Sequence, residues 1–180
     1  CETCTYSFVS PSSLDKINVP EDSNLRDFIR LINPLGEDTS VMRTTAIPSM
    51  LEMLHNNFAV RNRDAKLFEM ASIYIPHENV EELPDEMKRL VIGFYLNDVK
   101  DASGFYRMKG YIEALLAVGH TTGAEYAPCT TENVFHPGRC ATVSVNGVQI
   151  GIFGEVHPEV AANYGIGAPT YVAQLDFDAM

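Results

Sequence analysis

Tryptophan is absent from this sequence, cysteine occurs only four times in 180 residues, and positive charge is scarce. Thirteen lysines and arginines stand against 24 aspartates and glutamates, which gives a formal net charge of −11 at pH 7. Because affinity for nucleic-acid phosphates comes mainly from Lys and Arg, this balance disfavours nucleic-acid binding by the chain alone. It leaves room for a basic protein partner.

The sequence also lacks long apolar segments. No run approaches the roughly 18 residues that a membrane-spanning helix needs, and the first residues do not have the order of a signal peptide. We therefore expect a cytoplasmic protein with no membrane partner. The length is that of one domain, but the sequence starts with "CETCTYSFVS" and has no initial methionine. We expect residues 1–180 to form a single domain, a fragment of a longer chain.

The few cysteines give little sign of a metal site. Cys1-x-x-Cys4 has the spacing of half a zinc site, but no second CxxC or HxxxH pattern completes it. In a cytoplasmic protein the expected state of these two residues, and of Cys129 and Cys140, is the free thiol.

Two segments have the periodicity of substantial helices. The first begins near Pro48, with Thr44 or Thr45 as its cap, and the second is capped by Ser103 and ends at Gly119. Each carries an apolar stripe at helical spacing. The stripe residues are Met50, Leu51, Leu54 and Phe58 in the first helix, and Phe105, Met108, Ile112, Leu115 and Leu116 in the second.

Most other apolar segments alternate or are rich in β-branched and aromatic residues, which is typical of strands. This order of antiparallel strands interrupted by two helices predicts an α+β fold, an antiparallel β-sheet flanked by helices. The closing strand, with apolar residues at every second position, is expected to be half-buried. The predicted strands are 1–10, 27–34, a polar strand before the first helix, 65–75, 88–97, 124–129, 141–145, 148–155 and 170–179, with short helices at 11–17 and 158–164.

A hairpin is predicted at residues 141–155, where Asn146-Gly147 separates two alternating apolar segments. The turn sets the register of the two strands, so each partner follows by counting outward from it. The predicted pairs form one apolar face: Val145 with Val148, Val143 with Ile150, and Ala141 with Ile152.

The same count places His136 opposite His157 on the other face, with Cys140 and Glu155 nearby. Two imidazoles, a thiol and a carboxylate could bind zinc. Against a metal site, a proline follows each histidine and would break the ladder before that pair forms. We therefore interpret both His-Pro steps as turns with hydrogen-bonded rings, and the four residues remain weak metal candidates only.

Several stretches, taken in order, resemble one family, and together they span essentially the whole chain. They are similar to the class II synthetase-like core module of the β subunit of bacterial phenylalanyl-tRNA synthetase. The resemblance departs at Gly104, where we expect an acidic residue before the Phe-Tyr-x-x-Lys-Gly run. The stretches are "TYSFVSP", "NPLGEDTSVMRTTAIPSML", "LFEMASIY", "GFYRMKGYIEALL", "FHPGRCATVSVNGVQIGIFGEVHPEV" and "YVAQLDFD".

This resemblance implies the fold of class II synthetase catalytic domains in a module that has no chemistry of its own. The module would support a catalytic α subunit within an (αβ)2 complex that charges tRNA(Phe) with phenylalanine. ATP and magnesium would belong to the parent complex and no cofactor to this chain, and tRNA would be bound only through the full complex.

The residues allow a separate test for an ATP site. By the resemblance, active class II enzymes hold ATP phosphates with one arginine on a strand-loop-strand hairpin and a second near a glycine-rich strand. Here the loop between 65–75 and 88–97 is rich in carboxylates, which would repel a polyphosphate, and Lys88 and Arg89 are interpreted as solvated charges. The closing "APTYVAQLDFDAM" has no arginine. We therefore predict no ATP site and no catalytic residue. The loop carboxylates are Glu78, Glu81, Glu82, Asp85 and Glu86.

Arg43, in "MRTTAIP", has two interpretations. A similar stretch lies near substrate in the family's active relatives, so Arg43 and Glu69 could be the remnant of a cleft. Alternatively, Arg43 packs under the following helix and binds a carboxylate or a carbonyl. Because no ATP site is predicted, we favour the structural interpretation.

Two further expectations concern the second helix and the competing function. Lys109 is predicted to pair with Glu113 one turn later, and Gly110 to allow a neighbouring element to approach closely. The competing hypothesis is a free-standing adenylate-forming or amino-acid-binding domain, whose fold ATP or an amino acid would stabilise.

Overall fold

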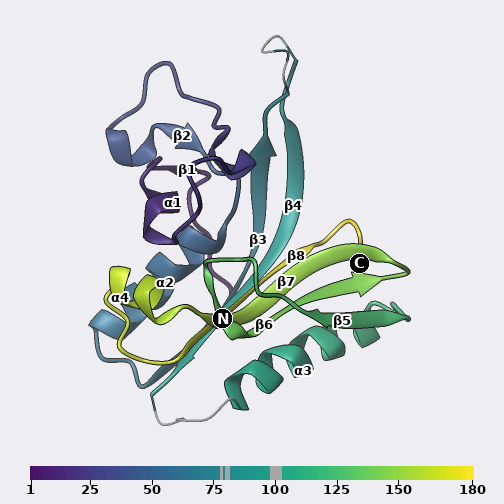
Figure 1. The fold of residues 1–180 in the computed structure, drawn as a ribbon. Helices are drawn as coiled ribbons and strands as arrows, with labels where there is room; N and C mark the ends of the chain where they lie inside the picture. The colour runs from purple at the N-terminus through teal and green to yellow at the C-terminus, as the bar shows by residue number, and fades with distance from the viewer. Residues whose placement is uncertain (78, 80–81, 98–102) are drawn as a thin grey trace.

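The computed structural model describes residues 1–77, 79, 82–97 and 103–180. Its centre is a six-stranded antiparallel sheet with the strand order β3-β4-β8-β7-β6-β5, shown in Figure 1. The predicted fold, an antiparallel sheet flanked by helices, is confirmed. The strands are β3 (Asp64–Ile75), β4 (Asp85–Leu96), β5 (Ala124–Pro128), β6 (Phe135–Val145), β7 (Val148–Val156) and β8 (Thr170–Asp176).

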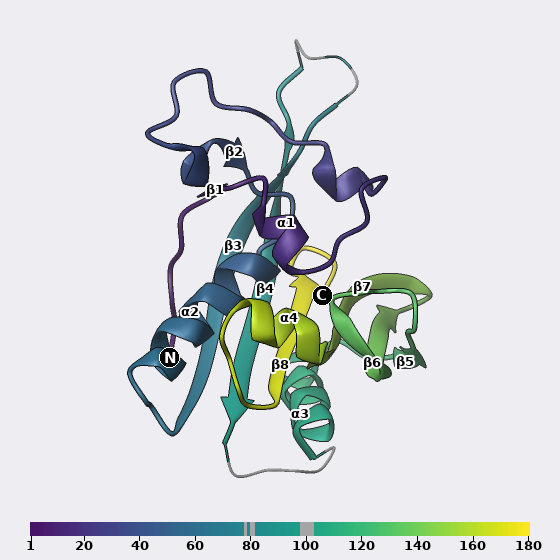
Figure 2. The same ribbon diagram turned by 60° about the vertical axis from the view of Figure 1, so that its left-hand side comes forward.

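The two long helices, α2 (Ile47–Ala59) and α3 (Ser103–Val118), pack on opposite faces of the sheet. Alternate residues of β4 show this, because Val91 and Tyr95 belong to the core beneath α2, whereas Leu90 and Phe94 belong to the core beneath α3. The short helices are α1 (Ser13–Lys16) and α4 (Pro158–Asn163), and α4 lies beside α2 in both views of Figures 1 and 2.

β8 differs from its prediction because of its place in the sheet. It is the last strand in the sequence but pairs with β4 on one side and β7 on the other. Tyr171, Val172, Ala173 and Leu175 are all 0% exposed, so the strand is buried on both faces and not half-buried. The pattern of apolar residues could not show this, because it depends on which strands lie beside it.

The start of α2 is not capped as predicted. Its N-cap residue is Ala46, which makes no side-chain cap, although Thr45 Oγ1 accepts from the Ile47 N–H at 3.4 Å. Pro48 lies in the first turn as expected. The Ala46 N–H and the Thr45 hydroxyl both donate to Gln174 Oε1 at 2.9 Å, so a central strand supplies the acceptor that a cap would otherwise provide. The apolar stripe is confirmed, since Met50, Leu51 and Leu54 are fully buried and Phe58 packs edge-on against Tyr95.

The stripe of α3 is also confirmed. Met108, Ile112 and Leu116 are buried, and Phe105 and Leu115 are partly buried against the same cluster. Ser103 is the first described residue of the helix, and its predicted capping role stays a prediction because residues 98–102 lie outside the described part of the chain. Lys109 Nζ contacts Glu113 Oε1 at 2.8 Å as predicted, whereas a Cβ on Gly110 would meet nothing within 4 Å, so the predicted close approach there is wrong.

The first 45 residues form few regular elements. β1 (Phe8–Val9) and β2 (Val41–Met42) make a separate two-stranded sheet, and η1 (Asn24–Arg26) and η2 (Glu37–Thr39) are short 3-10 helices. The predicted strand at 27–34 is wrong, because only Arg30 forms a bridge, to Val41. Ile32 is 95% exposed, so its side chain has no core to pack against. Residues 1–3 run beside β3 and are joined to it by hydrogen bonds.

The predicted hairpin is present, with Asn146 at φ +51° and Gly147 at φ +80° in its turn. Val145 pairs with Val148 as predicted, but the register then shifts by one residue. Val143 pairs with Gly151, and Ala141 with Phe153. The two predicted pairs farther from the turn are therefore wrong. Gly151 lies where a Cβ would be 2.6 Å from the Gln174 carbonyl oxygen, which ties this part of β7 closely to β8.

Among the described residues, no helix is both long and apolar enough to cross a membrane.

Candidate functional site

Arg43 lies where the chain leaves β2 and crosses to α2. Its N–H donates to the Ser7 carbonyl at 2.9 Å, and its carbonyl accepts from the Tyr74 N–H at 2.9 Å. The backbone is thus tied to the segment before β1 and to the end of β3. The side chain is 2% exposed. A buried guanidinium needs partners, because an unpaired buried charge is very costly.

Protein oxygen atoms surround that guanidinium. Nη2 contacts Glu69 Oε1 at 3.1 Å, Nε donates to the Ser72 carbonyl at 2.8 Å, and Nη1 donates to Thr5 Oγ1 at 2.7 Å and to Ser49 Oγ at 3.4 Å. Thr5 in turn donates to the Glu69 carboxylate through its N–H at 3.2 Å and its hydroxyl at 2.8 Å. The structure therefore brings Arg43 and Glu69 together, in a network that joins the N-terminal segment, β3 and α2.

The sheet face beneath α3 is filled with aromatic side chains. Tyr171 stacks on Phe94 with ring centroids 5.1 Å apart, and Phe105 of α3 stacks on Phe153 at 5.2 Å. Tyr171, Phe94 and Phe153 are all 0% exposed. The Tyr171 hydroxyl donates to Glu155 Oε2 at 3.0 Å, so its one polar atom is satisfied within the layer. The middle of this face is a packed core.

Gly104 fits this aromatic layer. A Cβ at this position would lie 2.2 Å from Cε2 and 2.3 Å from Cζ of Tyr171. The first turn of α3 can rest on the Tyr171 ring only because residue 104 has no side chain. The acidic residue expected from the resemblance would clash with the ring. The departure at Gly104 therefore has a structural reason that the sequence alone did not show.

Comparison with known proteins assigns the family. A family model described as "Phenylalanyl tRNA synthetase beta chain CLM domain" matches residues 1–177. The chain belongs to this family. Curated proteins named phenylalanine–tRNA ligase beta subunit, from Clostridium acetobutylicum and Clostridium tetani, are 43% and 40% identical over 179 residues. The alignments cover 99% of this chain and 22% of each relative, so the chain spans about a fifth of the length of these relatives.

Solved structures show the same fold at low sequence identity. The pyrrolysyl-tRNA synthetase from Desulfitobacterium hafniense matches 97% of this chain and 60% of its own chain, with a TM-score of 0.75 and 12% identity. A second structure of that synthetase gives the same TM-score at 11% identity. These likenesses concern the fold alone, and they agree with the class II synthetase-like architecture predicted from the sequence.

In this CLM domain, the carboxylates expected between β3 and β4 have local partners where they are described. Glu78 and Glu81 lie outside the described residues. Glu82 accepts from Asn79 Nδ2 at 3.1 Å, and Asp85 lies 3.4 Å from His77 Nε2. Hydrogen bonds from Ser72 and then Lys88 lower the pKa of Glu86. Asp85 and Glu86 belong to β4 and not to the loop.

Arg89 is not the solvated charge that its position predicted. Its Nη1 contacts Asp176 Oδ2 at 2.9 Å, and its side chain is only 15% exposed. The two residues are directly opposed partners of β4 and β8. One aspartate of the closing strand of the CLM domain is therefore neutralised by a cross-strand arginine. Sequence reasoning missed the pair because its members are far apart in the chain.

The structure does not place His136 opposite His157. Phe135 pairs with Val156 and Cys140 with Gly154, so residues 136–139 bulge from the ladder. Both histidine rings accept a hydrogen bond on Nδ1 from the backbone two residues later. Their donors are the N–H groups of Gly138 at 3.0 Å and Glu159 at 3.3 Å. The predicted hydrogen bonds to both rings are confirmed, but the predicted turns are wrong, because His136-Pro137 lies in the bulged part of β6 and His157 is the N-cap of α4.

The other two metal candidates are also engaged. Glu155 is held by Arg139, with Nε–Oε2 at 2.6 Å and Nη2–Oε1 at 2.9 Å. Burial raises the pKa of the Cys140 thiol far above its ordinary value, and Cys129 and Glu132 add to this effect. A thiol that keeps its proton is a poor zinc ligand. Across residues 1–77, 79, 82–97 and 103–180, no three His, Cys, Asp or Glu side chains are grouped to hold a metal ion. All four cysteines are free thiols.

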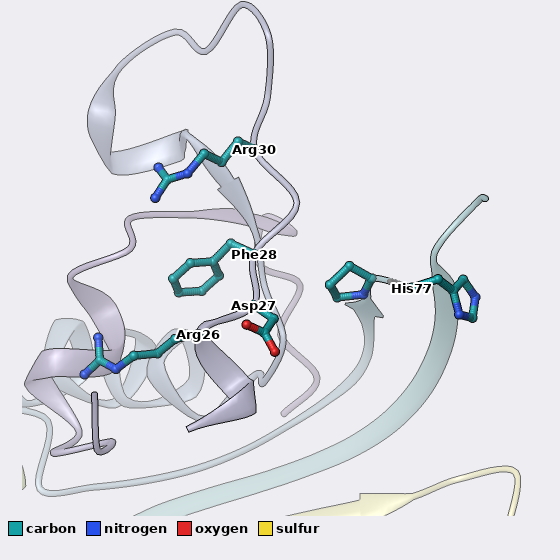
Figure 3. Close-up of a pocket in the computed structure, with 6 residues that line it drawn as sticks. Arg26, Asp27, Phe28, Arg30 and His77 are labelled. Carbon is teal, nitrogen blue, oxygen red and sulfur yellow. The ribbon is translucent and has the colours of Figure 1, made fainter. Parts of the chain in front are cut away.

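A polar pocket of about 470 Å³ lies beside η1 (Figure 3). Arg26 is already bound to Asp15 and to two backbone carbonyls. Figure 3 shows Phe28 between the Arg26 and Arg30 side chains, and the His77 ring directed away from both. The charged groups therefore do not converge on one point. The lining residues are Arg26, Asp27, Phe28, Arg30, Pro76 and His77.

Proposed function

We propose that this chain is the non-catalytic, synthetase-like module of the β subunit of a phenylalanine–tRNA ligase, and that residues 1–180 form one domain of it. Its role is positional. It supports the catalytic α subunit within an (αβ)2 complex and keeps that subunit's site ordered. The name of the relatives, phenylalanine–tRNA ligase beta subunit, supports this proposal.

The observation that carries the proposal is the filled sheet face. Adenylate formation needs cationic donors and metal-binding carboxylates directed into an open, preorganised cavity. Here Tyr171, Phe94 and Phe153 are packed beneath α3. Arg43 and Arg89 are committed to Glu69 and Asp176. The module thus keeps the architecture of a synthetase domain and uses its cations to hold the fold together.

The parent complex that we propose uses ATP and magnesium to charge tRNA(Phe) with phenylalanine in the cytoplasm. This chain contributes no cofactor ligand to it, and it meets tRNA only within the full complex. Its net charge of −11 agrees with a protein partner and not with direct phosphate binding.

The first prediction concerns nucleotide binding. ATP, magnesium and phenylalanine, added together or singly, should leave the thermal unfolding midpoint of the 180-residue chain unchanged. A ligand bound at 100 times its Kd would add about 2.7 kcal/mol of stability, which calorimetry would detect. A cooperative transition in the unliganded sample is the control for folding. A saturable rise in the midpoint with ATP would contradict the proposal in favour of an adenylate-forming domain.

The second prediction concerns assembly. The complete β subunit that carries this module should co-purify with a tagged α subunit, and the mixture should charge tRNA(Phe). The α subunit alone should lose aminoacylation activity, because its site depends on the partner for order. The matched control is a β subunit lacking only the segment equivalent to residues 1–180. If that deletion still bound α and supported full charging, the positional role would be wrong.

A further inference from the structure

Cys129 and Cys140 lie opposite one another at the open end of the β5–β6 pair. The last paired residues of this ladder are Pro128 and Ala141. One step further, the Cys129 N–H donates to the Cys140 carbonyl at 3.0 Å. Opposed residues of antiparallel strands hold their Cβ atoms roughly 4.5–5.5 Å apart. A disulfide needs roughly 3.5–4.5 Å, so a small shift at the end of a ladder would suffice.

The two side chains face the same way. The Cys129 side chain is close enough to help raise the pKa of Cys140, and both residues pack in the core beneath α2. Their exposure differs. Cys140 is 6% exposed, whereas Cys129 is half-buried and its Sγ lies 3.6 Å from Thr131 Oγ1. The Cys129 thiol can therefore react with a reagent from solution, whereas the Cys140 thiol is shielded from solvent.

We propose that Cys129 and Cys140 form a reversible dithiol–disulfide pair, a modification site for hydroperoxides. The accessible Cys129 thiolate attacks one oxygen of hydrogen peroxide, which gives a sulfenic acid and hydroxide. The Cys140 sulfur then attacks the Cys129 sulfur and expels the sulfenic oxygen, and the thiol proton leaves with it as water. In total, two thiols and one peroxide give one disulfide and two waters. A thiol reductant reverses the change.

The disulfide would act at one edge of the sheet. β5 is an edge strand held by β6 alone, and the loop that follows it leads to the bulge at 136–139. A bond from Cys129 to Cys140 closes that loop. It would fix the end of β5 close to Arg139, which contacts Glu155. Closing a loop of this length is expected to raise the unfolding midpoint on the order of 5 °C.

Trypsin provides a direct test, because Arg139 separates the two cysteines. The folded full chain is treated with hydrogen peroxide, blocked with a thiol-alkylating reagent and digested. The expected product is peptide 110–139 joined by a disulfide to the peptide that begins at Cys140. The amount of this product should exceed, by roughly tenfold, the amount of any product in which either peptide is joined to peptide 1–16, which carries Cys1 and Cys4. The reason is that the opposed thiols have a high effective concentration. The reductant should release both peptides.

Three controls make the outcome decisive. In urea, where the ladder is lost, the preference for the Cys129–Cys140 product should disappear. Cys129→Ser should abolish the product, whereas Cys4→Ser should leave it unchanged. Two results would overturn the proposal: recovery of Cys129 as a sulfinic acid with Cys140 alkylated separately, or equal joining of Cys129 to Cys140 and to peptide 1–16. The wild-type digest alone decides this if the Cys129→Ser variant fails to fold.

Discussion

Replacing Arg43 with alanine is expected to lower the free energy of unfolding by about 3–5 kcal/mol. The change would leave the Glu69 carboxylate, whose side chain is 4% exposed, buried without its cation. It would also remove the donors that reach the Ser72 carbonyl and the Ser49 hydroxyl. Urea unfolding followed by circular dichroism would measure the loss, as a lower midpoint with an unchanged slope.

The matched control is Arg30→Ala, which removes an exposed arginine that has no described side-chain ion pair and should change stability by less than about 0.5 kcal/mol. The double variant Arg43→Met/Glu69→Leu replaces both charges with apolar groups and should recover much of the loss, as replacement of whole buried ion pairs often does. If Arg43→Ala unfolded at the same urea concentration as Arg30→Ala, the buried network would not be stabilising the fold, and the cleft-remnant interpretation of Arg43 would regain weight.

Elements with a strong local signal could be predicted from the sequence, including α2, which contributes Ser49 to this network. The stripe from Met50 to Phe58 follows helical spacing, and Asn146-Gly147 has the residues that a two-residue turn demands. Both signals are local, and both elements are present. The resemblance grouped Glu69 with Arg43, but only as two members of one region and not as an ion pair. The hydrogen bonds that Thr5 adds from the N-terminal segment have no sequence signature.

What could not be predicted depends on strand order. The insertion of β8 between β4 and β7 buries both faces of that strand and creates the Arg89–Asp176 pair. It also supplies Gln174 as the acceptor at the start of α2. No local pattern encodes which strands become neighbours. The register shift between Ser144 and Val143 also could not be predicted, because counting residues outward from the turn assumes an unbroken ladder.

The weak metal candidates also depended on a register that the sequence could not predict. His136 and His157 were placed together by counting along an unbroken ladder, and the bulge at 136–139 separates them. The prolines that follow them were the better guide, because Pro cannot donate to a ladder. The departure at Gly104 is a different case, because only the structure shows its reason. A Cβ at residue 104 would lie 2.2 Å from Tyr171 Cε2, so the departure from the resemblance reflects the close packing of α3 on this ring.

Two glycines of α3 give the second prediction of large effect, because the same substitution should act with opposite sign at each. Gly104→Ala should destabilise the chain by about 1–3 kcal/mol, since its Cβ would lie 2.2 Å from Tyr171 Cε2 and the buried ring has no free space to enter. Gly110→Ala should stabilise it by about 1 kcal/mol, since a Cβ there meets nothing within 4 Å. Thermal unfolding of both variants would measure the difference.

A third variant connects this measurement to function. Tyr171→Leu shortens the side chain beneath residue 104, so the double variant Gly104→Ala/Tyr171→Leu should cost less than the sum of the single changes, by roughly 0.5–3 kcal/mol of coupling. That coupling would locate the strain between α3 and the aromatic layer. If Gly104→Ala were tolerated as well as Gly110→Ala, α3 would not rest on Tyr171. The sheet face could then open, and packing beneath α3 would no longer exclude a nucleotide from this module.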